Sequence, residues 1–280
     1  MPTNYTLYKN LIPSSDGYNK IESFMCMPNH TTPRCVVQII NGARECFACH
    51  AELCEYLTER GYIVCGHDKS GVGQATSEAE THPYAANGEK ILTWDTQRMT
   101  AIIRQNLEGL PVVYVGFGEG SLIARKILNE AGAADGYILI NTIGKNKKTA
   151  RAKRKTASAS SFGREKKSGL KIYEKLFGVC DKASCNLCGD ITLASLSDLF
   201  DLLDSACETR KDRYVKKGTP ILIISNGESK ESPYNIWAEE LYNRYISGGL
   251  ADVRMIQYET KALENSAFAF IENWLKERNF

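Results

Sequence analysis

The feature that most constrains the fold is a regular alternation of continuous apolar segments with amphipathic ones. Short runs rich in Val and Ile, such as 35–40 (CVVQII) and 111–117 (PVVYVGF), are typical of strands that are buried on both faces. The segment 89–107 carries its apolar residues at helical spacing and predicts a helix between two strands. Strands and helices that alternate in this way predict an α/β fold with a mostly parallel central sheet and helices on both of its faces.

The same patterns recur along the rest of the chain. Further strands are predicted at 61–68, 136–143, 219–227 and 251–259, and further helices at 49–62, 120–132, 194–206, 236–249 and 266–279. Ligands of parallel sheets bind beyond the carboxyl ends of the strands. Function is therefore expected in the loops that follow residues 40, 66, 117, 143, 226 and 259.

One segment departs from this alternation because it is strongly basic. Residues 145–171 contain eleven Lys or Arg and a single Glu, in a chain whose net charge is only +2. The segment is rich in Ser, Ala and Thr, so it is interpreted as an insertion or a mobile loop. We expect one domain, in which 1–144 and 191–280 form the core and 145–190 form a small, basic cap.

The charge of this segment limits its partners. Cations from Lys145 to Lys171 attract phosphate or anionic lipid, so a lipid contact is one hypothesis and a solvated cap is the other. Phe162 is the only aromatic residue of the segment, so base stacking is not indicated and no nucleic acid is expected.

A glycine-rich turn follows the strand at 111–117. Gly116 to Gly120 read G-F-G-E-G between a predicted strand and a predicted helix. This context fits the nucleophile elbow G-x-S-x-G, in which small residues permit a sharp turn and a serine stands at the centre. The central residue here is Gly118, which has no side chain.

With these motifs, the chain resembles α/β-hydrolases of the lysophospholipase, monoacylglycerol lipase and serine aminopeptidase-like group. Four stretches carry the resemblance: VQIINGARE, LCEYLTERGYIVCGHDKSGVGQ, GLPVVYVGFGEGSLIARKIL, and NLCGDITLASLSDLFDLL with GTPILIISNGESKESP. The resemblance covers nearly the whole chain, except much of 145–178. The resemblance implies the α/β-hydrolase fold with an inserted cap. It also implies a structural role for Asp68 in the turn after its strand.

The resemblance further implies a catalytic triad of Ser, Asp or Glu, and His, in that chain order. The three matching positions are Gly118, Lys230, and Leu263 or Ala262, depending on one gap. The last histidine of the chain is His82, so no base exists at the usual late position. We therefore predict a degenerate triad and a non-catalytic protein, a pseudoenzyme.

The oxyanion loop of the group also differs, because its His-Gly is replaced by Asn41-Gly42. Backbone N–H groups do not depend on side chains, so those of Ala43 and Glu119 still predict an anion-friendly corner at a helix N-terminus. Candidate ligand-binding residues are therefore Asn41, Gly42, Ala43, Gly118 and Glu119. The expected occupant of this cleft is a small or acyl-bearing molecule, or a protein partner.

Two other functional classes stay open. The chain is an active ester or lipid hydrolase if Ser121, or Cys46 or Cys49 beside His50, replaces the nucleophile. Alternatively, it is a structural subunit that pairs with an active paralogue, and its oligomeric state is open.

The ten cysteines include two C-x-x-C pairs, Cys46/Cys49 and Cys185/Cys188. Two such pairs can form a zinc site if the fold brings them together, and a metal or redox pair is one alternative. The distance between the pairs in sequence far exceeds that of zinc ribbons, so scattered core thiols are predicted. We expect no metal and no cofactor. The N-terminal residues show no apolar signal segment, and no apolar run is long enough to span a membrane, so a cytoplasmic location is expected.

Overall fold

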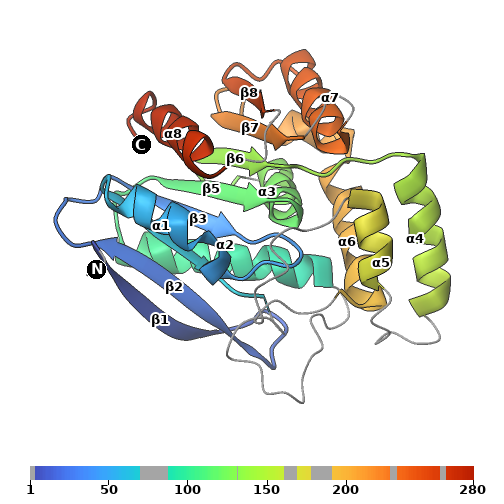
Figure 1. Cartoon of the computed structure of the whole chain (residues 1–280), viewed down its shortest axis with the longest axis horizontal. Coiled ribbons are helices and arrows are strands. Elements are labelled where there is room, and N and C mark those ends of the chain that lie inside the picture. Colours follow the sequence, from blue (N-terminus) through green and yellow to red (C-terminus); the bar gives the residue numbers. More distant parts are fainter. Residues whose placement is uncertain are drawn as a thin grey trace.

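A computed structural model describes residues 4–69, 88–130, 132–160, 169–177, 191–227, 232–258 and 263–280 (Figure 1). Its strands are β1 (Tyr5–Pro13), β2 (Lys20–Pro28), β3 (Cys35–Ile40), β4 (Tyr62–His67), β5 (Val112–Phe117), β6 (Gly136–Ile140), β7 (Ile221–Asn226) and β8 (Val253–Tyr258). Its α-helices are α1 (Ala51–Thr58), α2 (Gly88–Asn106), α3 (Glu119–Glu130), α4 (Lys147–Ser160), α5 (Gly169–Phe177), α6 (Leu193–Ala206), α7 (Pro233–Ser247) and α8 (Leu263–Lys276). Two short 3₁₀ helices, η1 (Phe47–His50) and η2 (Thr209–Tyr214), complete the described elements.

The strands of the described residues form one sheet in the order β1-β2-β4-β3-β5-β6-β7-β8. β2 runs antiparallel to both β1 and β4, whereas every pair in the series β4-β3-β5-β6-β7-β8 is parallel. Ile40 pairs with Gly116, and Phe117 pairs with Ile140. The carboxyl ends of β3, β5 and β6 therefore meet at one edge, and the predicted mostly parallel sheet is confirmed.

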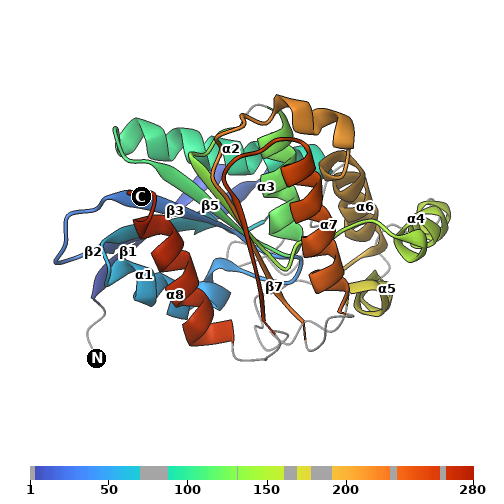
Figure 2. The ribbon, with the colours of Figure 1, turned by 90° about the horizontal axis from the view of Figure 1, so that it is seen from above.

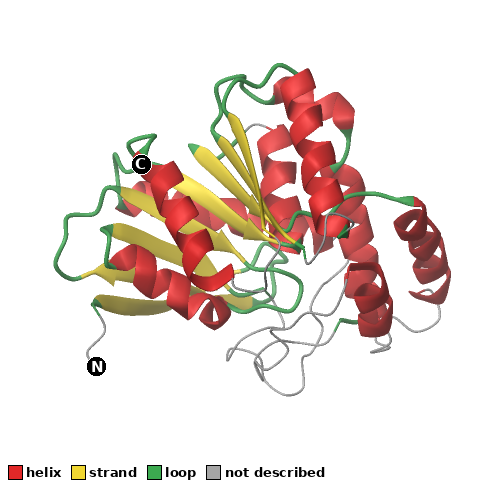
Figure 3. Cartoon of the chain, turned by 45° about the horizontal axis from the view of Figure 1, so that its top comes forward, coloured by secondary structure: helices red, strands yellow, loops and turns green. Residues whose placement is uncertain are grey.

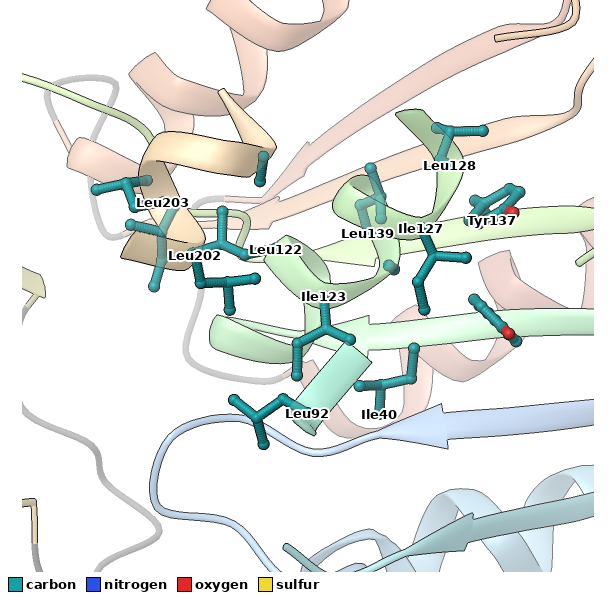
Figure 4. Packing of buried hydrophobic residues seen from close by; sticks show 14 of the residues in the cluster. Ile40, Leu92, Leu122, Ile123, Ile127, Leu128, Tyr137, Leu139, Leu202 and Leu203 are labelled. Carbon is teal, nitrogen blue, oxygen red and sulfur yellow. The ribbon is translucent and has the colours of Figure 1, made fainter. Parts of the chain in front are cut away.

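Helices cover both faces of this sheet (Figures 2 and 3). Alternate residues of β5 point to opposite cores: Tyr114 packs with α2, α3, α6 and α7, and Val115 packs with α1 and α8. Helix α3 directs its apolar side chains toward the sheet, α2 and α6 (Figure 4). Ile123 and Ile127 of α3 are almost fully buried, and each such side chain contributes about 1.5–3 kcal/mol by leaving water. This packing fixes α3, and with it the turn that precedes the helix.

The basic segment is helical, so the mobile-loop prediction is wrong for 147–160. Asn146 caps α4, because its Oδ1 accepts hydrogen bonds from the N–H groups of Lys148 and Thr149, each at 2.9 Å. In return, Thr149 Oγ1 accepts one from the N–H of Asn146 at 2.9 Å. This reciprocal cap resembles a capping box, and the Ala, Lys and Arg that follow favour helix. Figures 1 and 3 show α4 at the outer end of the molecule, with α5 and α6 nearer the sheet.

The sequence patterns predicted no element before residue 35, but β1 and β2 form a hairpin there. The two strands pair from Tyr5 with Pro28 to Pro13 with Lys20. Leu7 and Leu11 remain exposed, so β1 lacks the one-sided burial that makes a strand recognisable in sequence. No helix in the described part of the chain is both long enough and apolar enough to cross a bilayer.

Candidate ligand-binding site at the strand-to-helix turn

The turn between β5 and α3 keeps the tight geometry of a nucleophile elbow. A Cβ added at Gly116 would lie 2.6 Å from the carbonyl oxygen of Gly120, and one added at Gly120 would lie 2.0 Å from that of Ile40. Both glycines are therefore required by close backbone contacts. Gly118 differs, because an added Cβ would meet no heavy atom of the described residues within 4 Å. Within the described part of the chain, its φ of +50° is the one feature that favours glycine, so residue 118 has open space on the side of the described residues.

The other two triad positions cannot be compared with Gly118 in the same way. Lys230 lies outside the described residues, as do Glu228 and Ala262. Leu263 is the first residue of α8, and its side chain is outside the described part of the structure. The predicted degenerate triad therefore rests on the sequence at these two positions.

The two buried histidines of the described residues, His67 and His50, have other groups beside their ring nitrogens. His67 is buried, with Nδ1 3.1 Å from the carbonyl oxygen of Asp68 and Nε2 3.5 Å from Thr96 Oγ1 of α2. Burial lowers the pKa of His67, which favours its neutral form. His50 is also buried, and its Nε2 lies 3.5 Å from Glu45 Oε2.

A buried ion pair joins the oxyanion loop to the turn. Lys69 Nζ donates a hydrogen bond to the carbonyl oxygen of Gly42 at 2.7 Å and forms an ion pair with Glu119. Both charged side chains are only 3% exposed. Lys69 follows β4, Gly42 follows β3, and Glu119 begins α3, so one cation fixes three loops at the carboxyl edge of the sheet. Gly42 and Glu119 were predicted for this site from the sequence, whereas Lys69 was not.

Asn41 and Gly42 have further partners that define the loop. Asn41 Nδ2 donates to the carbonyl oxygen of His67 at 3.2 Å and to Asp68 Oδ1 at 3.1 Å. The N–H of Gly42 donates to Glu45 Oε2 at 2.7 Å. Asn41 thus takes part in holding the loop, and its replacement of the group's histidine has a structural use. The predicted ligand-binding residues Asn41, Gly42, Ala43, Gly118 and Glu119 lie on the two segments that the ion pair joins.

Asp68 is the acceptor at the base of the loop. Besides Asn41, its Oδ1 accepts a hydrogen bond from the N–H of Phe47 at 2.6 Å. The side chain is buried, and this burial raises the pKa of Asp68 to about 6 in spite of these hydrogen bonds. The carboxyl therefore anchors η1 to the turn after β4, in agreement with the structural role that the resemblance implied.

This raised pKa predicts a pH-dependent stability. The folded protein binds a proton at Asp68 below about pH 6, whereas the unfolded chain does so only near the ordinary value of 3.8. Proton uptake therefore favours folding, and stability from this group increases as the pH falls from 6 to 4. At about 1.4 kcal/mol for each pH unit between the two pKa values, the gain amounts to roughly 3 kcal/mol.

We expect wild-type protein to gain stability relative to Asp68→Asn as the pH is lowered from 7 to 4. Urea denaturation at several pH values measures the difference in the free energy of unfolding. The exposed Glu108→Gln variant is the control, and its curve should run parallel to that of the wild type. If the stability of Asp68→Asn changed with pH just as that of the wild type does, the raised pKa of Asp68 would be contradicted.

Ser121 is not accessible as a substitute nucleophile. The side chain is fully buried in the first turn of α3. Its Oγ donates to the carbonyl oxygen of Gly118 at 2.6 Å and lies 2.9 Å from Thr142 Oγ1. These contacts assign Ser121 to the support of the turn.

The Cys46/Cys49 pair lies at the start of η1, with the two Sγ atoms 3.6 Å apart. Cys46 is buried and Cys49 is half-buried. Cys185 and Cys188 lie outside the described residues, so a meeting of the two pairs is not tested. Within the described ranges, no three His, Cys, Asp or Glu side chains are grouped as metal ligands.

Comparisons with known proteins identify the family and the fold. Residues 31–177, just over half of the chain, match the model of a family described as serine aminopeptidase, S33. A search of curated proteins gave no match.

Among solved structures, a thermostable carboxyl esterase from Bacillus coagulans in complex with glycerol superposes with a TM-score of 0.83. It has 16% sequence identity and covers 98% of this chain and 99% of its own. A soluble variant of monoglyceride lipase from Saccharomyces cerevisiae, bound to a substrate analogue, gives a TM-score of 0.66 at 16% identity, with 99% and 96% covered. The predicted resemblance and the α/β-hydrolase fold are thereby confirmed.

Proposed function

Because this chain belongs to the serine aminopeptidase S33 family, we propose that it is a non-catalytic member that binds a small, acyl-bearing ligand. The observation that carries the proposal is Gly118, which stands without a side chain in an otherwise intact elbow. Acyl transfer by this fold needs a nucleophile, a base that takes its proton, and an acid that orients the base. Gly118 supplies no nucleophile, and no histidine follows His82.

The backbone around Gly118 still favours an oxygen-bearing ligand. The N–H of Glu119 lies in the first turn of α3, where no preceding helical turn provides an acceptor. Ala43 lies on the loop that Lys69 ties to the same turn. Donors at a helix N-terminus attract carbonyl or carboxylate oxygen, and the open space at Gly118 is where such a group fits.

Turnover of short p-nitrophenyl esters tests the absence of catalysis. We expect wild-type protein and Ser121→Ala to release p-nitrophenol no faster than buffer. Release that is lost in Ser121→Ala would identify Ser121 as a nucleophile, and release that survives would show another one; either result overturns the proposal.

Ligand binding is tested separately with butyrate and decanoate as probes. Stabilisation by a ligand at about 100 times its Kd amounts to about 2.7 kcal/mol, so thermal unfolding detects it. We expect the carboxylates to raise the Tm of the wild type but not of Gly118→Leu, whose side chain fills the open space. Gly109→Leu is a matched control, because Gly109 also has a positive φ, +84°, and open surroundings. Equal responses of both variants would place the binding elsewhere.

The main alternative is a hydrolase that uses Cys46 or Cys49 with His50. Cys49 precedes His50 in η1 and Cys46 is the residue before that helix, although His50 Nε2 faces Glu45 Oε2. Labelling by a thiol-directed probe that blocks ester turnover, and that is lost on one Cys→Ala substitution, would favour this alternative. A stable complex with an active paralogue and no response to carboxylates would favour a structural subunit.

A further inference from the structure

The cations of α4 fall into two groups with different surroundings. Lys153 lies between α4 and α6, with Nζ 2.7 Å from Asp201 Oδ1 and 2.5 Å from Asp204 Oδ2. Lys145, just before the helix, lies 2.6 Å from Asp204 Oδ1. These two lysines are neutralised by α6 and hold α4 in place.

The second group is an exposed row of five cations, here called the α4 cationic face: Lys147, Lys148, Arg151, Arg154 and Lys155. Among the residues that the structure describes, no carboxylate forms an ion pair with any of the five. At 100° per residue, the five positions fall within an arc of about 120° and extend over roughly 12 Å of helix. The buried residues Thr149 and Thr156 lie on the opposite side, toward α6.

This arrangement is unfavourable for the isolated protein. Arg151 has like-charged neighbours three or four residues away at Lys147, Lys148, Arg154 and Lys155, and such pairs destabilise a helix. Lys147 and Lys148 also stand at the N-terminus of α4, where the helix dipole disfavours cations. The described helix contains no acidic residue that offsets these effects. An anionic partner removes all of them together.

We propose that the α4 cationic face docks on a membrane surface rich in anionic phospholipid. The face carries no aromatic, Asn or Gln side chain that stacks on or reads a base, so its chemistry addresses phosphate charge alone. It also carries no apolar side chain, so the contact is adsorption to headgroups without insertion. Helix α5 lies beside α4 and adds the exposed Lys171 and Lys175, and a convex helix surface with several cations suits a broad, flat partner better than a groove-bound one.

The test measures cosedimentation of the full chain with phosphatidylcholine vesicles, with and without phosphatidylserine. The variant Lys147→Gln/Arg151→Gln/Lys155→Gln removes three cations along one line of the face. Arg210→Gln/Lys216→Gln/Lys217→Gln is its matched control, because it removes two exposed lysines and one exposed arginine away from α4. Each variant changes the net charge equally, so a nonspecific effect of charge appears in both.

We expect binding only to vesicles that contain phosphatidylserine. The α4 variant should lose affinity on the order of 100-fold, and the control variant should lose far less. Raising the salt from 0.1 to 1 M shortens the Debye length from about 10 to 3 Å, so binding should disappear. The thermal stability of the α4 variant should equal or exceed that of the wild type, because like-charge contacts are removed.

Three results would overturn the proposal. One is wild-type protein that ignores phosphatidylserine. Another is equal loss of vesicle binding in both variants. The third is tight, salt-dependent binding of a DNA or RNA duplex, lost in the α4 variant, without vesicle binding; that result would assign the face to nucleic acid.

Discussion

Replacement of Lys69 with Met is expected to lower the free energy of unfolding by about 3–5 kcal/mol. The substitution leaves the Glu119 carboxylate buried without its cation, and it removes the donor to the Gly42 carbonyl oxygen. Both side chains of the pair are 3% exposed, so water does not replace the lost partner. Urea denaturation with an unchanged m-value would establish that the effect is on the folded state.

A double-mutant cycle separates the pair from its surroundings. Lys69→Met/Glu119→Met replaces two charges with apolar side chains of similar size, and this exchange is often neutral in a buried site. We expect the double variant to recover most of the lost stability, to within about 1–2 kcal/mol of wild type. The exposed pair Arg254–Glu277 is the matched control, and Arg254→Met should cost no more than about 1 kcal/mol. Additive losses at Lys69 and Glu119 would contradict an ion pair that joins the loops.

The central sheet could be predicted because its strands are apolar along their whole length. The run CVVQII coincides with β3, and 111–117 contains β5. The first residue of a helix is harder to predict from apolar spacing, because capping and first-turn residues determine it. For example, α7 begins at Pro233, before the expected residue 236, because proline favours the first turn of a helix.

The basic segment shows where composition misled the prediction. The abundance of Ser, Ala, Thr and cations predicts a loop, but Ala, Lys and Arg also favour helix. Asn146 and Thr149 cap the N-terminus of α4 and so mark where the helix begins. The packing that holds α4 comes from Asp201 and Asp204, about fifty residues later in the chain. No local pattern reveals an ion pair between such distant segments.

One part of the candidate site could be predicted from the sequence and another part could not. Gly118 could be identified from the sequence, because the elbow motif lies between one strand and the next helix. The Lys69–Glu119 pair could not, because the two residues are fifty positions apart and lie in loops that only the parallel sheet brings together. In the sequence, this ion pair is represented only by one lysine after β4 and one glutamate after Gly118. Such residues are too common to predict a specific contact.

Restoration of the triad is expected to create an ester hydrolase. The variant Gly118→Ser/Lys230→Asp/Leu263→His supplies the nucleophile, acid and base in the family's chain order. The Ser side chain fits, since a Cβ at Gly118 meets no heavy atom of the described residues within 4 Å. Its positive φ costs about 1–2 kcal/mol, which a folded domain tolerates.

Turnover of p-nitrophenyl butyrate by this variant should exceed that of Gly118→Ala/Lys230→Asp/Leu263→His by at least about 100-fold, the usual contribution of a positioned base. The control differs only in the hydroxyl at residue 118. If the histidine introduced at residue 263 acts as the base, turnover should rise with pH through about 6.5. This pH dependence distinguishes it from nonspecific ester cleavage by surface lysines, whose ordinary pKa is about 10.4. A variant that folds and stays inactive would show that the loops after β7 and β8 no longer meet the elbow. In that case the difference from an active hydrolase would extend beyond the side chains at these three positions.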